Sequence, residues 1–385
     1  MTPPRLLMLA DDLTGAADAA GYFARSGLRT LVRFAPGQVE GAEVLALSTH
    51  SRHLAPETAA RAQGQALAQA GGWVSGAAVY KKIDSTLRGH PAVELAAVLA
   101  ALGRRRVLVA PAFPSQRRTT VGACMYVDGL PLGQTSFGGE GDLRQAFGTM
   151  GLPMHPLPLP AVRAPGLAGL LQEEGCWLAD AEVDEDLHRL ARASLDAGID
   201  LWCGSAGLAR ALGGVLWPEV GEQPSLPGPD SMPVLVVAGT RHARTQEQVA
   251  ALVRGGAVLG APQQEGLLRA LLATGRTVVL SARGLPEGEP EQVAAMLAGA
   301  AGQLLDRGQV GGVVLTGGDT ALAVCLGLGS SGIWLRGEVE PGIPWGVLAD
   351  GPHAGLRVVT KAGGFGGPEA LVQAVALLGG GPTWN

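Results

Sequence analysis

Short apolar runs rich in valine and leucine alternate along this chain with alanine- and leucine-rich stretches of helical period. This alternation is typical of β-α units built around a mostly parallel sheet. The predicted strands are Leu6–Leu9, Val44–Leu47, Ala78–Lys81, Val107–Ala110, Val234–Val237, Val278–Leu280 and Val313–Thr316. The predicted helices are Gly15–Ser26, Pro56–Gln69, Pro91–Leu102, Asp184–Ala197, Thr245–Val253 and Glu289–Leu305. The fold class is therefore expected to be α/β.

The stretch from Trp217 to Pro233 interrupts this pattern with five prolines and is predicted to be a linker. A chain of 385 residues also exceeds what one hydrophobic core usually organises. We therefore expect two α/β domains, 1–225 and 232–385, with the active site in the cleft between them. The segment from Pro131 to Pro165 is rich in glycine and proline and is predicted to contain loops that cover or shape a pocket.

Composition and charge narrow the classes of function. The chain is 47% hydrophobic and carries a net charge of -5 with both signs interspersed, so no basic stripe indicates a nucleic-acid partner. The apolar run at the N-terminus is shorter than a signal peptide, and no window reaches the length of a membrane span. We expect a cytoplasmic protein with no membrane partner. The sequence leaves the oligomeric state open, with a homodimer as one option.

Two aspartates and a threonine follow the first predicted strand, in the segment Ala10-Asp11-Asp12-Leu13-Thr14-Gly15. Open α/β sheets bind ligands beyond the carboxyl ends of their strands. Burying two adjacent ionised carboxylates costs a large amount of free energy. We therefore expect one of them to face the ligand and to accept a proton or a hydrogen bond from a hydroxyl group. The alternative is that Asp12 or Thr14 caps the next helix, and for Thr14 the cap is favoured.

A second polar cluster, Lys81-Lys82-Ile83-Asp84-Ser85-Thr86-Leu87-Arg88-Gly89-His90, also lies between a strand and a helix. Four potential cations, a carboxylate and short hydroxyl side chains suit a small polyhydroxylated anion. A solvated charged loop is the alternative. Arg118, after the strand that ends at Ala110, is a further candidate, although it is equally explained as a surface charge.

Two glycine-rich turns in the C-terminal half each follow an apolar strand. Gly317-Gly318-Asp319-Thr320 opens a helical stretch, so its backbone N–H groups can bind phosphate oxygens, and Asp319 is expected to hold Mg²⁺ or cap the helix. Lys361-Ala362-Gly363-Gly364-Phe365-Gly366-Gly367 has the same layout. His242, after a third strand, is a plausible nucleotide contact. Two tight structural turns are the alternative.

Lysine is almost absent from the chain. Its basic residues are arginines apart from Lys81, Lys82 and Lys361, and all three lysines lie beside the motifs above. This placement suggests sites that need a compact ammonium group rather than a planar guanidinium. Chance placement is the alternative.

The ordered set of motifs resembles the four-carbon acid sugar kinase family over nearly the whole chain. The segments that carry the resemblance are Ala10–Gly15, Lys81–Gly89, Ala112–Pro114 with Tyr126–Leu132, Gly204–Leu212, Gly317–Thr320 and Lys361–Gly366. The resemblance implies ATP-dependent phosphorylation of the terminal hydroxyl of a tetronate or 3-oxo-tetronate, with Mg²⁺. The chain departs from the family pattern at His50, where the family tends to have aspartate, at His242 and at Gly138–Asp142.

On this basis each candidate residue receives a role. The expected catalytic residues are Asp12, which orients or deprotonates the acceptor hydroxyl, Lys82 and Asp84. The expected substrate-binding residues are Asp11, Thr14, Arg52, Ser85, Arg88 and Arg118. The expected nucleotide-binding residues are His242, Gly317, Gly318, Asp319, Thr320, Lys361 and Gly363, with Asp319 also as the metal ligand.

Three alternative functions remain open at this stage. The chain could be a kinase for a sugar acid of different length, or a non-catalytic sensor of sugar acids or nucleotides. A nicotinamide-dependent dehydrogenase is disfavoured, because the GxGxxG spacing of Gly327–Gly332 closes a helix and precedes a strand, the reverse of what pyrophosphate binding needs.

Overall fold

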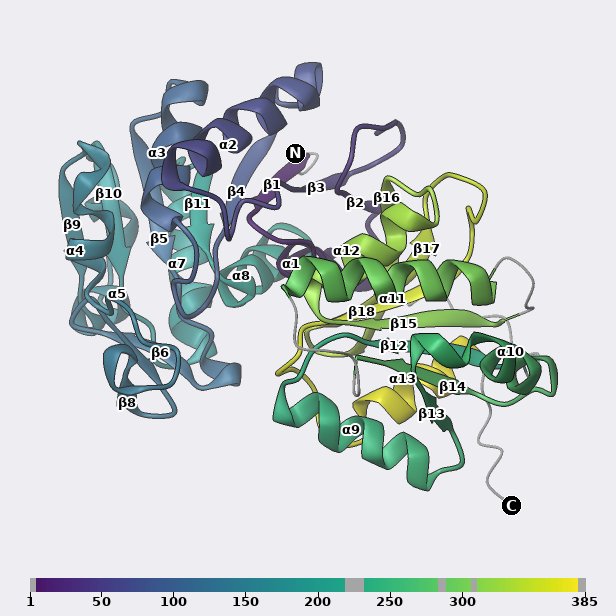
Figure 1. Cartoon of the computed structure of the whole chain (residues 1–385). Coiled ribbons are helices and arrows are strands. Elements are labelled where there is room, and N and C mark those ends of the chain that lie inside the picture. Colours follow the sequence, from purple (N-terminus) through teal and green to yellow (C-terminus); the bar gives the residue numbers. More distant parts are fainter. Residues whose placement is uncertain (1–4, 219–231, 283–288, 306–309, 380–385) are drawn as a thin grey trace. The chain divides into compact units, whose positions relative to one another are not determined.

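The computed structural model describes residues 5–218, 232–282, 289–305 and 310–379 (Figure 1). The chain forms two compact units, Met1–Ser26 with Glu43–Val220 and Gly27–Ala42 with Gly221–Asn385. Most of the predicted linker, 219–231, lies outside the described residues.

A parallel sheet forms the centre of the first unit. Its strands run in the order β3 (Val44–Ser48), β1 (Leu6–Ala10), β4 (Ala78–Lys82), β11 (Leu201–Gly204), β5 (Arg106–Ala110), β10 (Gly175–Ala179) and β9 (Met154–Leu157). β1 is buried along its whole length, as the apolar run Leu6–Ala10 predicts for a central strand.

Helices cover both faces of this sheet. They are α1 (Leu13–Arg25), α2 (Pro56–Ala70), α3 (Pro91–Leu102), α4 (Leu143–Phe147), α5 (Leu159–Arg163), α6 (Leu167–Leu170), α7 (Asp184–Asp196) and α8 (Ala206–Leu216). α2 packs on α3, whereas α8 packs on both α1 and α7. Because crossovers between parallel strands are right-handed, the connection from β1 to β3 and that from β3 to β4 lie on opposite faces. The order of the strands thus changes direction at β1 and β4, which is where such sheets bind ligands.

A small antiparallel sheet accompanies the large one in the first unit. It consists of β6 (Arg118–Val121), β7 (Cys124–Val127) and β8 (Leu130–Pro131). Asp180 holds its tight turn by accepting hydrogen bonds from the backbone N–H groups of Gly122 and Ala123.

The second unit also has one sheet, with a parallel part and an antiparallel part. The strand order is β13 (Val258–Gly260), β14 (Val278–Ser281), β12 (Val234–Ala238), β15 (Gly312–Thr316), β18 (Arg357–Lys361), β17 (Ile343–Leu348), β16 (Gly332–Glu340) and β2 (Thr30–Arg33). The first five strands are parallel, and the last three pairings are antiparallel. Its helices are α9 (Ala243–Arg254), α10 (Glu265–Ala273), α11 (Pro290–Leu305), α12 (Gly318–Gly327) and α13 (Ala370–Leu378).

The segment Gly27–Ala42 belongs to the second unit although it precedes most of the first unit in sequence. β2 pairs with β16, and the buried Arg33 forms an ion pair with Asp350 at 2.6 Å. A single cut of the chain between 225 and 232 therefore does not describe how the residues pack.

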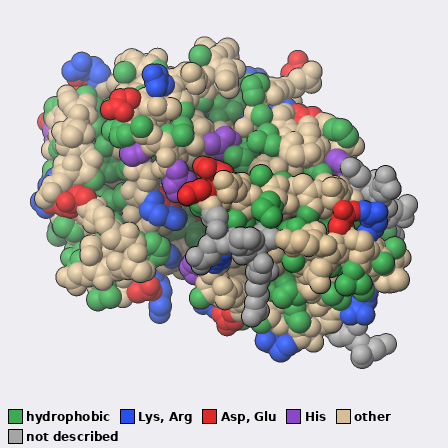
Figure 2. All heavy atoms as spheres, viewed as in Figure 1, with side chains coloured by type: hydrophobic (Ala, Val, Ile, Leu, Met, Phe, Trp, Pro, Cys, Tyr) green, Lys and Arg blue, Asp and Glu red, His purple; other side chains and the backbone are tan. Residues whose placement is uncertain are grey.

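Every strand and helix named from the sequence is present in its predicted place, within a few residues at each end. The segment Pro131–Pro165, predicted to contain loops, also supplies α4, β9 and α5. On the face drawn in Figure 2, basic side chains lie scattered among acidic and uncharged ones. Among the helices that the structure describes, not one combines the length and apolar character that crossing a bilayer demands.

Candidate active site

Asp12 begins α1 at the carboxyl end of β1. Its side chain accepts a hydrogen bond from the backbone N–H of Gly15 at 3.0 Å and one from the hydroxyl of Thr14 at 2.6 Å. Asp12 is therefore the N-cap, and the interpretation of Thr14 as a cap rather than a ligand contact was wrong. A Cβ at Gly15 would lie 2.4 Å from Asp12 Oδ1 and 3.2 Å from Lys82 Nζ. Any larger residue at position 15 would therefore clash with the Asp12 carboxylate in its present position.

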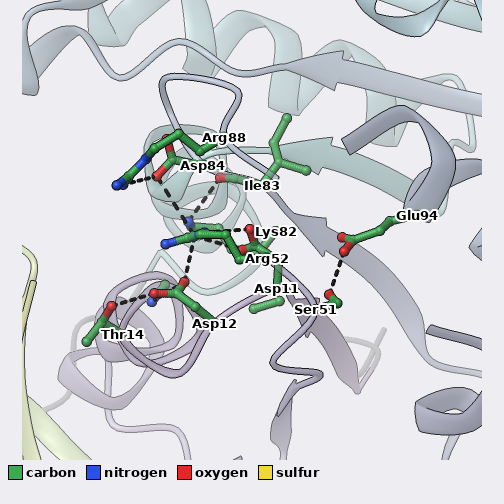
Figure 3. A network of polar contacts seen from close by, with 12 residues as sticks. Asp11, Asp12, Thr14, Ser51, Arg52, Lys82, Ile83, Asp84, Arg88 and Glu94 are labelled. Carbon is green, nitrogen blue, oxygen red and sulfur yellow. Dashed lines mark hydrogen bonds and ion pairs between the residues drawn. The ribbon is translucent and has the colours of Figure 1, made fainter. Parts of the chain in front are cut away.

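Arg52 brings three carboxylates together (Figure 3). It lies after β3, and its guanidinium donates two hydrogen bonds to Asp11, at 2.7 and 2.8 Å, and one to Asp12 at 2.7 Å. The same Nη2 atom is 3.8 Å from Asp84 Oδ1. Because Arg52 is largely buried, this geometry fixes the loops after β1, β3 and β4 relative to one another.

Asp84 organises the loop after β4. It receives hydrogen bonds from the N–H and hydroxyl of Thr86 and a bidentate pair from Arg88, at 3.0 and 2.7 Å. The side chain of Arg88 remains half exposed, and Ser85 lies half-buried in the same turn. Arg88 can therefore reach a ligand while Asp84 holds it in place.

The carboxylates at this site differ in their titration. Burial raises the pKa of Asp11 above its ordinary value, although Arg52 opposes that shift. Burial also acts to raise the pKa of Asp12, but the charges of Arg52 and Lys82 outweigh it and leave that pKa below its ordinary value. For Asp84, hydrogen bonds from Arg88 and the charge of Arg52 overcome burial, and its pKa lies well below the usual range. Asp12 and Asp84 are thus ionised at neutral pH.

Two further cations lie near these carboxylates. Lys82 is buried, donates to the carbonyl of Ile83 at 3.0 Å, and its charge acts on Asp12. Arg118 lies close enough to Asp84 for the two charges to interact, and its Nε is buried without a hydrogen-bond partner among the described residues. Burial lowers the pKa of Arg118. A desolvated donor of this kind gains free energy when an anionic ligand pairs with it.

A buried network that the sequence reasoning missed supports the loop carrying Arg52. Lys81 Nζ pairs with Glu94 at 2.6 Å, and Glu94 accepts a hydrogen bond from Ser51, which directly precedes Arg52. Gln63 donates to Ser51 and to Thr49 in the same loop. The signal was present in the sequence: side chains alternate along a strand, so Lys81 and Lys82 must point to opposite faces.

In the second unit, the two glycine-rich loops after β15 and β18 meet the loop after β12, which carries Thr240 and His242. A Cβ at Gly363 would lie 2.6 Å from Thr240 Oγ1, and one at Gly364 would lie 3.1 Å from the ring of His242. A Cβ at Gly317 would lie 3.5 Å from Thr240. The structure therefore brings the predicted nucleotide-binding segments of this unit together.

The N-terminus of α12 presents backbone donors at this place. Gly317 caps the helix with φ +100°, and Gly318, Asp319 and Thr320 form its first turn, whose N–H groups have no acceptor within the helix. Asp319 is exposed and is not the cap, so that alternative for Asp319 was wrong. No group of three or more metal-ligating side chains occurs within the described residues. Mg²⁺ is usually bound by only one or two protein carboxylates together with substrate phosphates. The exposed carboxylate of Asp319 is enough to meet this requirement.

His242 and Lys361 have structural contacts that the sequence did not predict. His242 caps α9 by accepting a hydrogen bond from the N–H of Arg244 at 3.1 Å. Lys361 is fully buried, and its ammonium group donates to backbone carbonyls of the loop that follows it. This arrangement differs from the direct nucleotide contact that we expected of Lys361.

Replacing Gly317 by alanine is expected to weaken nucleotide binding about tenfold, because a side chain at φ +100° costs about 1–3 kcal/mol and displaces the first turn of α12. Calorimetric titration with ADP measures this effect. Gly355 is the matched control, since it also has positive φ (+86°) but open space around it. Gly355→Ala is expected to lower stability while leaving ADP affinity unchanged, and equal loss of affinity in both variants would contradict the assignment.

Comparison with known proteins also assigns different ligands to the two halves of the chain. A family model described as a sugar-binding N-terminal domain matches residues 6–212, and one described as a nucleotide-binding C-terminal domain matches residues 235–371. The two matches cover the two candidate sites separately.

Curated relatives match over nearly the full length. A D-threonate kinase of Cupriavidus necator is 37% identical over 96% of each chain, and a D-threonate kinase of Salmonella typhimurium is 31% identical over 97% of this chain and 98% of its own. A 3-oxo-tetronate kinase of Cupriavidus necator is 29% identical over 98% of each chain.

Solved structures support the fold alone. A protein of Salmonella typhimurium has a TM-score of 0.79 at 21% identity, covering 96% of this chain and 98% of its own. A protein of Haemophilus influenzae has a TM-score of 0.75 at 20% identity, covering 97% of this chain and 100% of its own.

Fold, paired domains and relatives together define a kinase of two α/β units, one sugar-binding and one nucleotide-binding. The chain belongs to the four-carbon acid sugar kinase family.

Proposed function

We propose that this protein is an ATP-dependent kinase that phosphorylates the terminal hydroxyl of a four-carbon sugar acid, with D-threonate as the first substrate to test. The observation that carries the proposal is the charge balance of the first unit. The three carboxylates of Asp11, Asp12 and Asp84 are matched by three cations, those of Arg52, Lys82 and Arg88. Arg118 adds a fourth cation beside them. One carboxylate on the ligand would complete this balance.

The acceptor hydroxyl is assigned to Asp12. Its side chain is the most exposed of the three carboxylates, at 17% against 3% for Asp11 and 11% for Asp84. Asp11 accepts from Arg52 on both oxygens, and Asp84 accepts from Thr86 and Arg88. Asp12 accepts from Gly15 and Arg52 on Oδ1, but among the described residues its Oδ2 accepts only from the hydroxyl of Thr14. With a lowered pKa, Asp12 is a weak base, so it acts chiefly by accepting the hydrogen bond of the hydroxyl and orienting it.

The carboxylate end of the substrate is assigned to Arg88 and Arg118. Arg88 is half exposed and already anchored by Asp84, and Arg118 has a buried donor to satisfy. Ser85 lies in the same turn as Arg88 and can pair with an inner hydroxyl of the acid. Lys82 offsets the negative charge that develops as the hydroxyl attacks.

In the second unit, ATP phosphates would be held by the N–H groups of the first turn of α12 and of the loop at Gly363. Asp319, exposed in that first turn, would hold the Mg²⁺ ion that travels with the phosphates. Bound Mg²⁺ neutralises phosphate charge during transfer. Positioning the two reactants and excluding water is then the main task of the protein.

The proposal is tested by measuring ADP release from ATP and Mg²⁺ with a panel of threonates, erythronates and their 3-oxo forms. We expect the highest kcat/KM with D-threonate, because the relatives that are 31–37% identical are D-threonate kinases. Turnover confined to a longer or shorter acid would contradict the substrate. ATP binding without turnover on any acid would contradict the kinase and favour a sensor.

A further inference from the structure

We propose that Lys361 is a positioning residue that shapes the loop 362–367 so that its N–H groups bind the nucleotide's phosphate oxygens. This inference rests on the proposed function and extends it to a residue that does not touch the nucleotide. The loop follows β18 directly, and Lys361, the last residue of that strand, is fully buried.

The contacts of the ammonium group carry this inference. Lys361 Nζ donates to the carbonyl oxygens of Ala362 at 2.9 Å, Gly363 at 3.2 Å and Phe365 at 3.2 Å. It also contacts the hydroxyl of Thr245, at 3.1 Å. One cation therefore gathers the carbonyl ends of three peptide groups within a single loop.

Peptide geometry gives the consequence. In a planar trans peptide the C=O and the N–H of the next residue point in opposite directions. Because the three carbonyls point at Lys361, the N–H groups of Gly363, Gly364 and Gly366 point away from it. These N–H groups have no acceptor among the described residues. Successive outward N–H groups of this kind bind anions.

Uncharged side chains hold the same loop as well. Thr245 donates to the carbonyl of Gly363 at 2.7 Å, and Gln248 Nε2 donates to the carbonyls of Phe365 and Gly367 at 3.0 and 2.7 Å. Neutral donors thus already reach these carbonyls, so the shape of the loop alone does not explain a buried ammonium.

The charge of Lys361 has no direct counter-ion among the residues that the structure describes. Among the described residues, the contacts of its Nζ are carbonyl and hydroxyl oxygens, and no carboxylate forms an ion pair with it. Lys81, the equally buried lysine of the first unit, instead has Glu94 at 2.6 Å. Burying an unpaired ammonium is costly unless an anion compensates it. A phosphate group on the opposite side of the loop supplies that anion.

The protonation of Lys361 provides a way to detect its interaction with a bound phosphate. Burial and, to a smaller degree, Arg244 lower the pKa of Lys361 to about 7, and Glu340 opposes them. The other titratable group facing it is His242, whose pKa is lowered by burial and by Lys361 itself, so this ring is neutral at pH 8. At pH 8 Lys361 is therefore about nine-tenths neutral in the free protein. A bound phosphate raises its pKa, and the protein must take up a proton on binding.

The test is calorimetric titration of the full-length protein with ADP at pH 8, in buffers of different ionisation enthalpy. The nucleotide phosphates are ionised at this pH and contribute little proton exchange. We expect the wild-type protein to take up about half a proton or more per ADP bound. We expect Lys361→Met to take up none and to bind ADP about tenfold more weakly at pH 7.

Gln248→Met is the matched comparison, because it removes two hydrogen bonds to the same loop and keeps the charge. We expect weaker ADP binding in this variant with proton uptake retained. Absence of proton uptake by the wild-type protein, or unchanged uptake in Lys361→Met, would overturn the inference. ADP binding with proton uptake but no turnover on any sugar acid would remove the proposed substrate and leave the role of Lys361 standing, whereas no nucleotide binding at all would overturn both.

Discussion

Asp12→Asn is expected to lower kcat by roughly 10²–10⁴-fold while leaving the affinity for ATP unchanged. Asparagine is as good an N-cap as aspartate, and its Oδ1 can still accept from Gly15 and Arg52. The variant therefore removes the negative charge and one acceptor, but keeps the start of α1. Steady-state kinetics with the best substrate, together with ATP titration, measures both quantities.

Asp142→Asn is the control for this substitution. Asp142 also caps a helix, α4, by accepting a hydrogen bond from Arg144, and it lies outside the cluster around Arg52. We expect full turnover from Asp142→Asn. A kcat for Asp12→Asn within about threefold of the wild-type value would remove Asp12 from its role at the acceptor hydroxyl.

Lys81→Met is expected to cost about 3–5 kcal/mol of unfolding free energy, because it leaves the buried carboxylate of Glu94 without its partner. Urea denaturation followed by circular dichroism measures the loss. In the double variant Lys81→Met with Glu94→Gln, no unpaired charge remains and Ser51 keeps an acceptor. We expect this second change to restore most of the lost stability.

An exposed ion pair supplies the comparison. Arg105 pairs with Glu174 at 2.6 Å, but both side chains are more than half exposed. Arg105→Met is expected to cost at most about 1 kcal/mol. If Lys81→Met were no more destabilising than Arg105→Met, the buried network behind Arg52 would not have the role that we assign to it.

The sequence predicts the parallel core and the position of the candidate site for a simple physical reason. Strands buried on both faces, such as Leu6–Ala10, must be continuously apolar, so polar residues that follow them at once are conspicuous. Asp11, Asp12 and Asp84 were found in this way. Their convergence on one edge follows from the parallel arrangement of the strands.

The sequence did not predict which segments far apart in the chain pair with each other. Nothing local to Thr30–Arg33 indicates that it pairs with β16 about 300 residues later, or that Arg33 meets Asp350. The antiparallel strands β16 and β17 were likewise not named. These contacts depend on tertiary packing rather than on local periodicity.

The sequence also did not predict the direction in which the Lys361 side chain points. Lys361 was expected beside the nucleotide because it opens a glycine-rich turn, yet its ammonium group points to the carbonyls of its own loop. The rarity of lysine in the chain was more informative than the position of Lys361 beside a glycine-rich turn. All three lysines of the chain are buried, which supports the inference that a compact ammonium is needed at each position.

The most direct test of the proposed function is to identify the product of phosphoryl transfer. The full-length protein is incubated with ATP, Mg²⁺ and D-threonate, and the product is examined by ³¹P nuclear magnetic resonance and mass spectrometry. The account predicts a single phosphomonoester on the terminal hydroxyl, formed in step with ADP. Inorganic phosphate as the only phosphorus product besides ADP, or a phosphoryl group on another oxygen of the acid, would contradict it.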